Sequence, residues 1–123
     1  RFNESLDVLQ ALLCQEDVSW DGEYYQFEPL TIMPRPVRKG GPPMMMAVMN
    51  PEGIYHCTKR GFHIQTTPLS GNHQLLLDQV SAFNRAKEEM RAKEGEVTLT
   101  LSRVAHVASN SAEKQRKIKA AHQ

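Results

Sequence analysis

The sequence predicts an α/β fold made of about three strand–helix units, with a small β-hairpin ahead of them. Short apolar runs alternate along the chain with longer segments whose apolar residues recur at helical spacing. An Asp-Gly pair separates two β-prone stretches, and a proline- and glycine-rich stretch divides them from the strand–helix units. Strands that alternate with helices indicate a parallel sheet with right-handed crossovers.

The first predicted element is an amphipathic helix from Phe2 to Cys14. Its apolar residues recur at three- and four-residue steps, at Phe2, Leu6, Leu9 and Leu13. One face of the helix is therefore expected to pack on a core. Because the helical pattern is already under way at Arg1, we expect further chain upstream.

A β-hairpin is predicted from Val18 to Phe27. The Asp21-Gly22 pair stands between two β-prone stretches, and glycine accepts the positive φ that a tight hairpin turn needs. No regular element is expected from Pro29 to Pro43, because proline lacks a backbone donor and restricts the residue before it. We expect this stretch to run extended over a surface, and a domain linker is the alternative.

The first strand–helix unit starts at Met44. Met44 to Met49 is a short, wholly apolar run, which suits a parallel strand buried on both faces. Asn50-Pro51-Glu52 follows with a good N-cap, a proline at the first helical position and an acid in the first turn. This helix should run to about Arg60 and stop at Gly61, a residue suited to the left-handed C-terminal position.

The second unit begins with a strand predicted from Phe62 to Thr67. A longer helix is expected from about Asn72 to Lys93, with Gly95 ending it. The predicted inner stripe of this helix is Leu76, Val80, Phe83 and Met90.

The third unit comprises a strand from Val97 to Ala108 and a last helix. A change of phase at Val104 suggests a bulge or twist where the strand leaves the sheet. Asn110 and Glu113 have the spacing of a helix start.

Composition indicates a soluble globular protein, with 40% hydrophobic and 24% charged residues. The net charge of +1 gives no electrostatic footprint for nucleic acid or an acidic membrane. The longest apolar run is far too short to span a membrane, and we expect no signal peptide. The two cysteines suggest no disulfide framework, and the histidines match no metal site, so a metal-free cytoplasmic protein is expected. Basic residues gather late in the chain, as on a solvated helix face, at Lys114, Arg116, Lys117 and Lys119.

Several segments stand in a characteristic order along the chain. They are R-F-x-E-x-L-x-V-L from Arg1 to Leu9, the hairpin from Val18 to Phe27, Pro34-Arg35-Pro36-Val37 with Pro42-Pro43, and the Asn50 helix before Gly61. In this order they resemble the luciferase-like family of flavin-dependent monooxygenases, the bacterial luciferase and alkanesulfonate monooxygenase type. The resemblance covers nearly the whole chain, and the ordered series carries it rather than any single motif.

This resemblance implies that the chain is an internal to C-terminal piece of a TIM (β/α)8 barrel, roughly its fifth to seventh strands. A complete barrel needs roughly 250 residues. The chain would then be one partial-barrel domain over residues 1–123, with a helix over 1–17, the hairpin and proline-rich loop over 18–43, and βα units over 44–123. Alone, such a piece is expected to be incomplete and inactive.

The resemblance also implies a function. The parent enzyme would use reduced FMN and O2 to oxidise a small organic substrate, with a flavin reductase as a possible partner. A homo- or hetero-oligomer is expected. A deazaflavin-dependent oxidoreductase of the same superfamily is one alternative, and a non-catalytic half-barrel that serves as an assembly module is another.

The predicted site lies in the turns that follow the strands. A helix N-terminus suits a phosphate, and the family has a flavin-phosphate contact at the position of Asn50, so Asn50, Pro51 and Gly53 are the predicted cofactor-binding residues. A helix cap without a ligand is the alternative. Thr66 and Thr67 end the second strand at the same rim and are predicted to line a substrate pocket. No catalytic residue is assigned.

Overall fold

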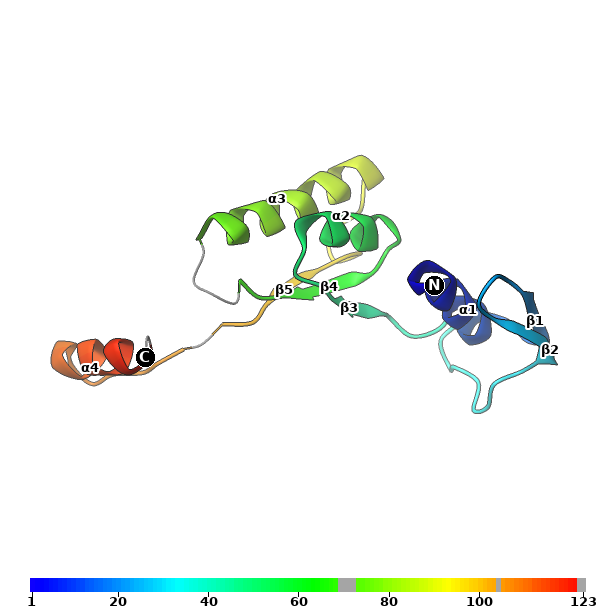
Figure 1. Cartoon of the computed structure of the whole chain (residues 1–123), viewed down its shortest axis with the longest axis horizontal. Coiled ribbons are helices and arrows are strands. Elements are labelled where there is room, and N and C mark those ends of the chain that lie inside the picture. Colours follow the sequence, from blue (N-terminus) through cyan, green and yellow to red (C-terminus); the bar gives the residue numbers. More distant parts are fainter. Residues whose placement is uncertain (69–72, 104, 122–123) are drawn as a thin grey trace. The chain divides into compact units, whose positions relative to one another are not determined.

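The computed structural model describes residues 1–68, 73–103 and 105–121. Its helices and strands, in chain order, are α1 (Phe2–Cys14), β1 (Val18–Asp21), β2 (Gln26–Leu30), β3 (Met45–Ala47), α2 (Pro51–Lys59), β4 (His63–Thr66), α3 (His73–Met90), β5 (Leu99–Leu101) and α4 (Ser111–Ala121) (Figure 1). The chain divides into two compact units, Arg1–Met44 and Met45–Gln123, and each contains one of the two sheets. The single partial-barrel domain over residues 1–123 stays a prediction.

The N-terminal unit contains helix α1 and the antiparallel hairpin of β1 and β2. The helix has the predicted bounds, and the hairpin lies where it was expected. Leu6, Val8 and Val18 are the buried apolar side chains of this unit. Its apolar core is therefore small.

The hairpin turn differs from the predicted tight Asp-Gly turn. Asp21 pairs with Gln26, so the loop spans Gly22 to Tyr25, and the Gly22 N–H donates to the Tyr25 carbonyl at 2.9 Å. Gly22 does not have a positive φ, so the turn does not need glycine for its backbone conformation. A Cβ at Gly22 would instead overlap the Glu4 carboxylate. Glycine is needed at this position because a carboxylate from α1 occupies the space beside it.

Strand β2 extends to Leu30, contrary to the prediction that the stretch from Pro29 to Pro43 contains no regular element. Val18 pairs with Leu30 and Trp20 pairs with Phe27, so β2 carries one residue more than β1 between these two pairs. Pro29 lies in this irregularity, where its missing N–H interrupts no regular ladder. The rest of the stretch has no helix or strand, as predicted.

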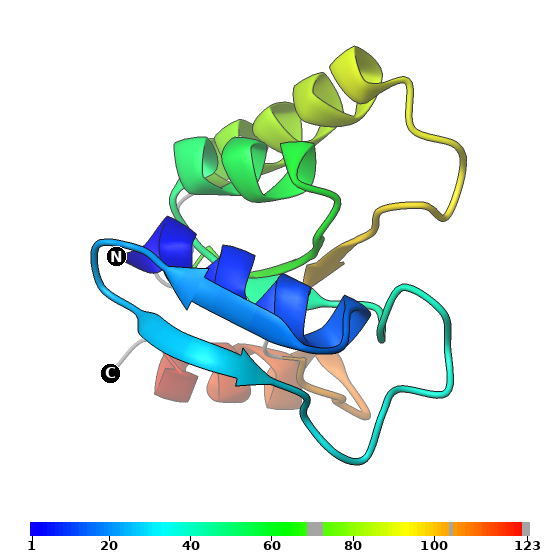
Figure 2. The same cartoon turned by 90° about the vertical axis from the view of Figure 1, so that its right-hand side faces the viewer.

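The second unit is built on a parallel sheet with the order β3-β4-β5, and α2 and α3 lie over one of its faces (Figures 1 and 2). The parallel pairing confirms the predicted strand–helix units. Along β4, Ile64 and Thr66 are buried on the helix-covered face, whereas Gln65 between them is exposed. The core therefore lies between the sheet and the two helices.

Helix α2 ends where its sequence signal predicted. Gly61 has a φ of 83°, its N–H donates to the Thr58 carbonyl at 2.8 Å, and the Phe62 N–H donates to the Cys57 carbonyl at 3.2 Å. These two hydrogen bonds form a Schellman motif, which satisfies carbonyls at the helix end. The left-handed glycine then turns the chain directly into β4.

Within the second unit, no described helix lies over the opposite face of the sheet, which corrects the prediction that the Met44 to Met49 strand is buried on both faces. Met45 and Met49 are 52% and 47% exposed. The strand itself is only Met45–Ala47. Helices α2 and α3 cover the other face, so the Met45 side chain on this face stays exposed. We call this surface the open face and define it by Met45, Ala47, His63, Gln65, Thr98 and Thr100.

The buried side of α3 also differs from the prediction. Its buried residues are Gln79, Ala82, Phe83 and Ala86. Of the predicted inner stripe only Phe83 is buried, whereas Leu76, Val80 and Met90 are half-buried. Two alanines on the buried side permit a close approach of α3 to its neighbours, and the apolar periodicity alone did not indicate this.

Helix α3 ends at Met90, ahead of the predicted Lys93. Arg91 follows with a φ of 52°, in the left-handed region, and this conformation stops the helix. Gly95, the predicted stop, has a φ of 80° but lies beyond the helix end. The expected start at Asn72 lies outside the described residues.

Strand β5 is shorter than the predicted strand from Val97 to Ala108. Its pairing with β4 ends at Leu101, opposite the last residue of β4. Beyond Leu101 the described chain has no strand partner and leaves the sheet. His106 is therefore outside any strand, contrary to the prediction. The predicted phase change at Val104 lies outside the described residues.

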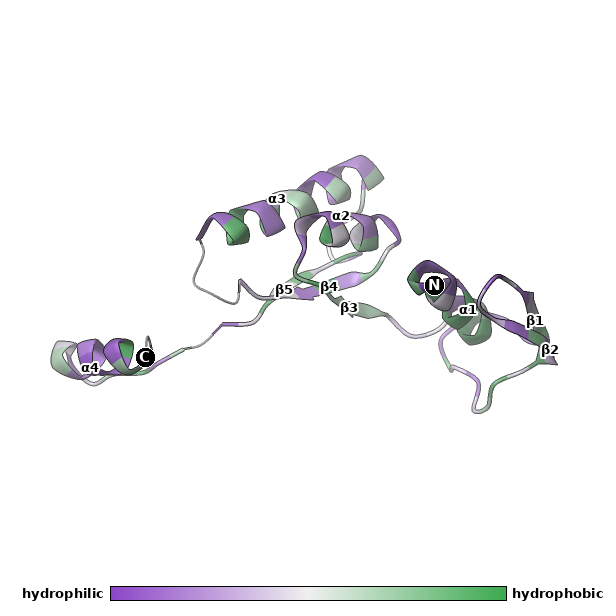
Figure 3. Cartoon of the chain, viewed as in Figure 1, coloured by the Kyte–Doolittle hydropathy of each residue, from purple (hydrophilic) through white to green (hydrophobic). Residues whose placement is uncertain are grey.

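Helix α4 starts with the predicted cap. Asn110 Oδ1 accepts from the Glu113 N–H and Glu113 Oε2 accepts from the Ser109 N–H, each at 2.9 Å. Most of α4 is hydrophilic (Figure 3), and none of its described side chains is buried. This agrees with the predicted solvated helix face. Across the described residues, no helix is long and apolar enough to cross a membrane.

Candidate functional site

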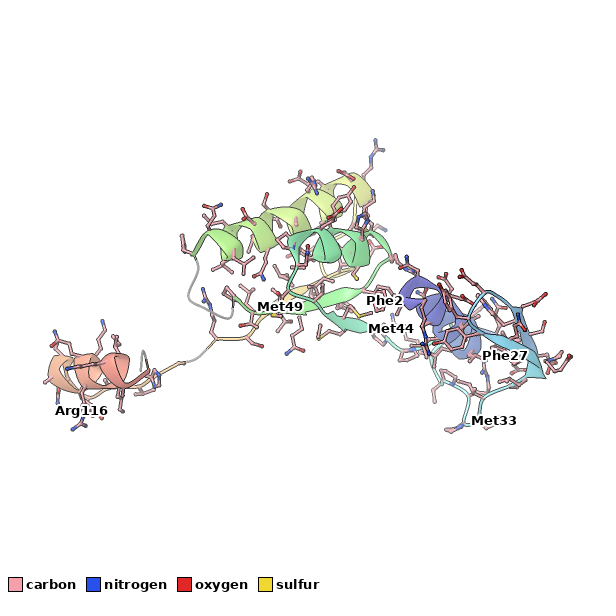
Figure 4. All side chains as sticks on the ribbon, viewed as in Figure 1. Phe2, Phe27, Met33, Met44, Met49 and Arg116 are labelled. Atoms are coloured by element: carbon pink, nitrogen blue, oxygen red, sulfur yellow. The ribbon has the colours of Figure 1, made fainter. Side chains whose placement is uncertain are left out.

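The ends of β3, β4 and β5 meet at one edge of the parallel sheet. We call it the carboxyl edge and define it by Met49, Asn50, Thr67 and Ser102, which follow the three strands. Met49, labelled in Figure 4, lies just beyond the end of β3. Ligands of open α/β sheets bind outside the carboxyl ends of the strands, so this edge is the candidate binding site.

Asn50 caps the N-terminus of α2 at this edge. Its Oδ1 accepts from the Glu52 N–H at 2.8 Å and from the Gly53 N–H at 3.4 Å. The backbone of Asn50 itself is extended, as is usual for an N-cap residue. Pro51 has no N–H to satisfy. The cap therefore occupies two backbone donors that a phosphate would otherwise use, and leaves Asn50 Nδ2 as the additional donor.

Gly53 is explained by packing within the unit. A Cβ at this position would lie 2.8 Å from Val48 Cγ2. The missing side chain thus lets α2 approach the end of β3. Sequence reasoning proposed close approach of a ligand at Gly53, and that role stays a prediction.

Thr66 and Thr67 differ in where their side chains lie. Thr66 is 3% exposed, on the same face as Ile64, and its Oγ1 has no hydrogen-bond partner in the part of the chain that the structure describes. Thr67 follows with its side chain half-buried. Thr67 is thus the more accessible of the two predicted pocket residues, and the pocket stays a prediction.

Gln79 from α3 joins two turns of the carboxyl edge. Its side chain is fully buried, and Nε2 donates to the Met49 carbonyl at 2.8 Å and to the Thr67 carbonyl at 3.4 Å. The acceptors precede Asn50 and Pro68 in the chain. One amide therefore holds the chain segments that leave β3 and β4.

Polar side chains also link neighbouring strands along the open face. His63 Nδ1 lies 2.9 Å from Thr98 Oγ1. Gln65 Nε2 donates to Ser102 Oγ at 3.4 Å, next to the carboxyl edge. The open face therefore combines an exposed methionine, Met45, with hydrogen-bonding side chains.

The site-forming residues of the carboxyl edge are neutral, and the charged cluster of this unit lies elsewhere, on the helices. Tyr55 Oη donates to Glu89 Oε2 at 2.6 Å, Lys59 Nζ donates to the same oxygen at 3.1 Å, and Arg85 lies 4.4 Å from the centre of the Tyr55 ring. Hydrogen bonding to Glu89 raises the pKa of Tyr55. No acid–base pair of this cluster reaches the carboxyl edge.

Neither a reactive Cys57 nor a metal cluster is indicated in the described part of the chain. Burial raises the pKa of the Cys57 thiol, although nearby Arg60 lowers it in part, so the thiol stays protonated and is a poor nucleophile. The described residues contain no group of three histidine, cysteine or acidic side chains that could hold a metal ion. The carboxyl edge can therefore contribute hydrogen bonds and a binding surface to a ligand.

Sequence reasoning missed Gln79, Gln65 and Ser102. A signal for Gln79 was present, because it stands three positions after Leu76 and four before Phe83, on the predicted apolar stripe. A lone polar residue on such a stripe indicates a buried hydrogen bond. Gln65 and Ser102 carried no comparable signal, since their contact depends on the pairing of β4 with β5.

Comparison with known proteins identifies the fold and family. The sequence model of a family described as luciferase-like monooxygenase matches residues 1–123. The chain is 27% identical over 91 residues to the oxygenase component of the flavin-dependent trigonelline monooxygenase of Acinetobacter baylyi, across 74% of this chain and 25% of that protein. The crystal structure of monooxygenase RslO1 from Streptomyces bottropensis matches 98% of this chain with a TM-score of 0.77 and 22% identity.

The chain spans 25% of the curated relative and 37% of the crystallised monooxygenase. At 22% identity the latter comparison shows a shared fold. The family match, by contrast, runs over all 123 residues. The chain belongs to the luciferase-like monooxygenase family.

Proposed function

We propose that this chain forms about three βα units of a TIM barrel in a flavin-dependent monooxygenase. The complete protein would use reduced FMN and O2 to oxidise a small organic substrate. The family match over residues 1–123 carries this proposal. The sheet supports it as well, because a TIM barrel has helices outside and a second sheet face turned inward. The open face would be that inward face.

The donor set at the start of α2 fits a flavin phosphate. Asn50 Oδ1 keeps the helix cap, and Nδ2 has no protein partner among the described residues. A partial positive charge at the helix N-terminus favours an anion there. Asn50 Nδ2 would then donate to a phosphate oxygen, while Pro51 and Gly53 shape the turn.

The bound flavin would supply the redox chemistry with O2. The residues of this chain would hold and orient the ligands and exclude water. Met45 and Ala47 on the open face would form part of an apolar wall, and Thr67 would lie at its rim. No described side chain of the carboxyl edge is needed as an acid or base.

A separate protein would supply the reduced flavin. The relative from Acinetobacter baylyi is named as an oxygenase component, which supports a reductase partner for this protein too. The strands that complete the barrel would come from further chain or from a second subunit, so an oligomer is part of the proposal.

The phosphate role can be tested with FMN and riboflavin, which differ in the phosphate. Asp is as good an N-cap as Asn, so Asn50→Asp should keep α2 intact while its carboxylate repels a phosphate. We expect Asn50→Asp to weaken FMN binding and leave riboflavin binding unchanged, as measured by flavin fluorescence quenching on the full chain. Asn50→Ser, which retains both a cap and a donor, is the matched control and should bind FMN like the wild type.

Equal losses for FMN and riboflavin, or no loss at all, would contradict a phosphate contact at Asn50. Titration with a deazaflavin in parallel separates the two cofactor classes. Light scattering during size exclusion gives the mass of the species that carries the flavin. A stable dimer that binds no flavin would instead support the half-barrel assembly module.

A further inference from the structure

Gln79 is a buried polar side chain whose partners lie in two separate turns. It is 0% exposed, as is Ile64 in the centre of the sheet. Its Nε2 donates to the Met49 carbonyl at 2.8 Å and to the Thr67 carbonyl at 3.4 Å. Along the chain Gln79 is 30 residues from Met49 and 12 from Thr67. The link is therefore tertiary and joins three elements.

Each of these carbonyls belongs to a peptide group that opens a turn. The Met49 carbonyl is part of the peptide bond to Asn50, and the Thr67 carbonyl is part of the peptide bond to Pro68. The peptide unit is planar, so a hydrogen bond to its oxygen also orients the next residue. Gln79 thus restricts the orientation of the Asn50 backbone, from which the Asn50 side chain projects.

The orientation of the Gln79 amide is set by these two acceptors. Gln79 Oε1 is buried and has no hydrogen-bond partner among the described residues, and the same is true of Thr66 Oγ1. A flipped amide would place its oxygen against two carbonyl oxygens, so the amino group must face the turns. The fold tolerates an unsatisfied buried acceptor in order to keep both turn carbonyls bonded, although such groups are costly.

We infer that Gln79 is a positioning residue for the cofactor turn. It holds the Asn50 turn and the Thr67 turn in a fixed relation, so that the phosphate donor and the pocket rim keep their spacing. This inference rests on the proposed function for the ligands, but the fixed relation of the two turns does not. Displacement of a binding group by about 1 Å is enough to reduce function strongly.

The first experiment measures amide hydrogen exchange in the full chain by NMR, and it needs no flavin. Gln79→Leu keeps the buried volume but removes the donor. The control is Phe83→Leu, which alters another buried residue of α3 that has no hydrogen bond to either turn. We expect Gln79→Leu to speed exchange at Glu52 and Gly53 by roughly tenfold or more through loosening of the turn. Phe83→Leu should leave these two amides as in the wild type.

A second variant covers the case in which Gln79→Leu does not fold. Gln79→Glu retains the shape, and its protonated carboxyl can donate one hydrogen bond where its carboxylate cannot. Because intrinsic amide exchange itself slows as the pH falls, each rate is compared with that of the wild type at the same pH. Exchange at Glu52 and Gly53 should therefore be faster than in the wild type at neutral pH and should match the wild type when the carboxyl is protonated. Unchanged exchange in the Gln79 variants, or equal acceleration in Phe83→Leu, would overturn the inference.

The second experiment titrates the same variants with FMN. Gln79→Leu should bind FMN roughly tenfold more weakly or worse, and Phe83→Leu should bind it as the wild type does. If the wild type binds no FMN, the proposed cofactor role fails, while the exchange data still decide whether Gln79 positions the turn. If exchange changes but FMN affinity does not, the turn is positioned by Gln79 but carries no flavin contact, and the inference is overturned in its functional part.

Discussion

The two units of the chain are held together in different ways. Among the described residues, the five largest fully buried side chains, with less than 2% exposure, all lie in the second unit, at Phe62, Ile54, Ile64, Gln79 and Thr58. In the first unit the most buried apolar side chains, Leu6 and Val18, are each 6% exposed. The second unit is thus built around a packed core, and the first is not.

The first unit relies instead on side chains that bond to backbone. The Glu4 carboxylate accepts from the Tyr24 and Tyr25 N–H groups at 3.1 Å and from Trp20 Nε1 at 3.2 Å. Arg35 Nη1 donates to the Leu12 carbonyl at 3.0 Å. A few polar contacts therefore fix the hairpin on α1. The stability of the second unit should therefore depend on core volume, whereas that of the first unit should depend on charge and on the close approach of Glu4 to the hairpin loop.

Loss of core volume in the second unit should destabilise the protein most. Ile64 is 0% exposed in the central strand β4, so Ile64→Ala should lower the free energy of unfolding by about 2–5 kcal/mol. Urea denaturation followed by far-UV circular dichroism measures this change. Leu9→Ala is the control, because Leu9 on α1 is 43% exposed, and it should change the free energy far less. Similar losses for both variants would remove the contrast between the units.

A smaller loss is expected from added volume in the first unit. In Gly22→Ala the new Cβ would overlap the Glu4 carboxylate and lie 2.6 Å from Trp20 Nε1. Either the loop or Glu4 must move, at a cost of about 1–3 kcal/mol. Trp20 is the single tryptophan of the chain, so its fluorescence during denaturation reports on this unit alone. Gly40→Ala is a control with open space at its Cβ, although it carries its own backbone cost because its φ is 87°. If the Trp20 fluorescence gave Gly22→Ala the same free energy of unfolding as the wild type, the Glu4 carboxylate would not be held beside the loop.

The elements that the sequence predicted are those whose signals are local. The cap at Asn50, the stop at Gly61 and the pair Asn110 and Glu113 each act over a few residues, and the structure has all three. The parallel order of the strands also followed from their alternation with helices. Local sequence therefore determined most of the fold of the second unit.

The features that the sequence did not predict depend on partners far along the chain. The role of Gly22 comes from Glu4 on another element, and the bond from Gln79 to the Met49 carbonyl spans 30 residues. The exposure of Met45 follows from the side of the sheet on which the helices lie, and an apolar run alone does not specify this. For the candidate site, sequence could name the Asn50 turn but not the residue that holds it.

The hairpin of the first unit should respond to acid through the Glu4 carboxylate. Partial desolvation raises the pKa of Glu4, but the hydrogen bonds from Tyr25, Tyr24 and Trp20 outweigh it, so the pKa lies below its usual value of 4.5. A carboxyl whose folded pKa is lowered stabilises the fold above its unfolded pKa, and this stabilisation is lost as the pH falls through the folded value. Trp20 fluorescence should therefore change as the pH falls below about 4.5, when Glu4 gains a proton and releases the loop. Glu4→Gln should remove this acid transition, because it has no proton to gain. An acid transition of Trp20 that persists in Glu4→Gln would mean that another group controls the hairpin, and the first unit would then not depend on this carboxylate.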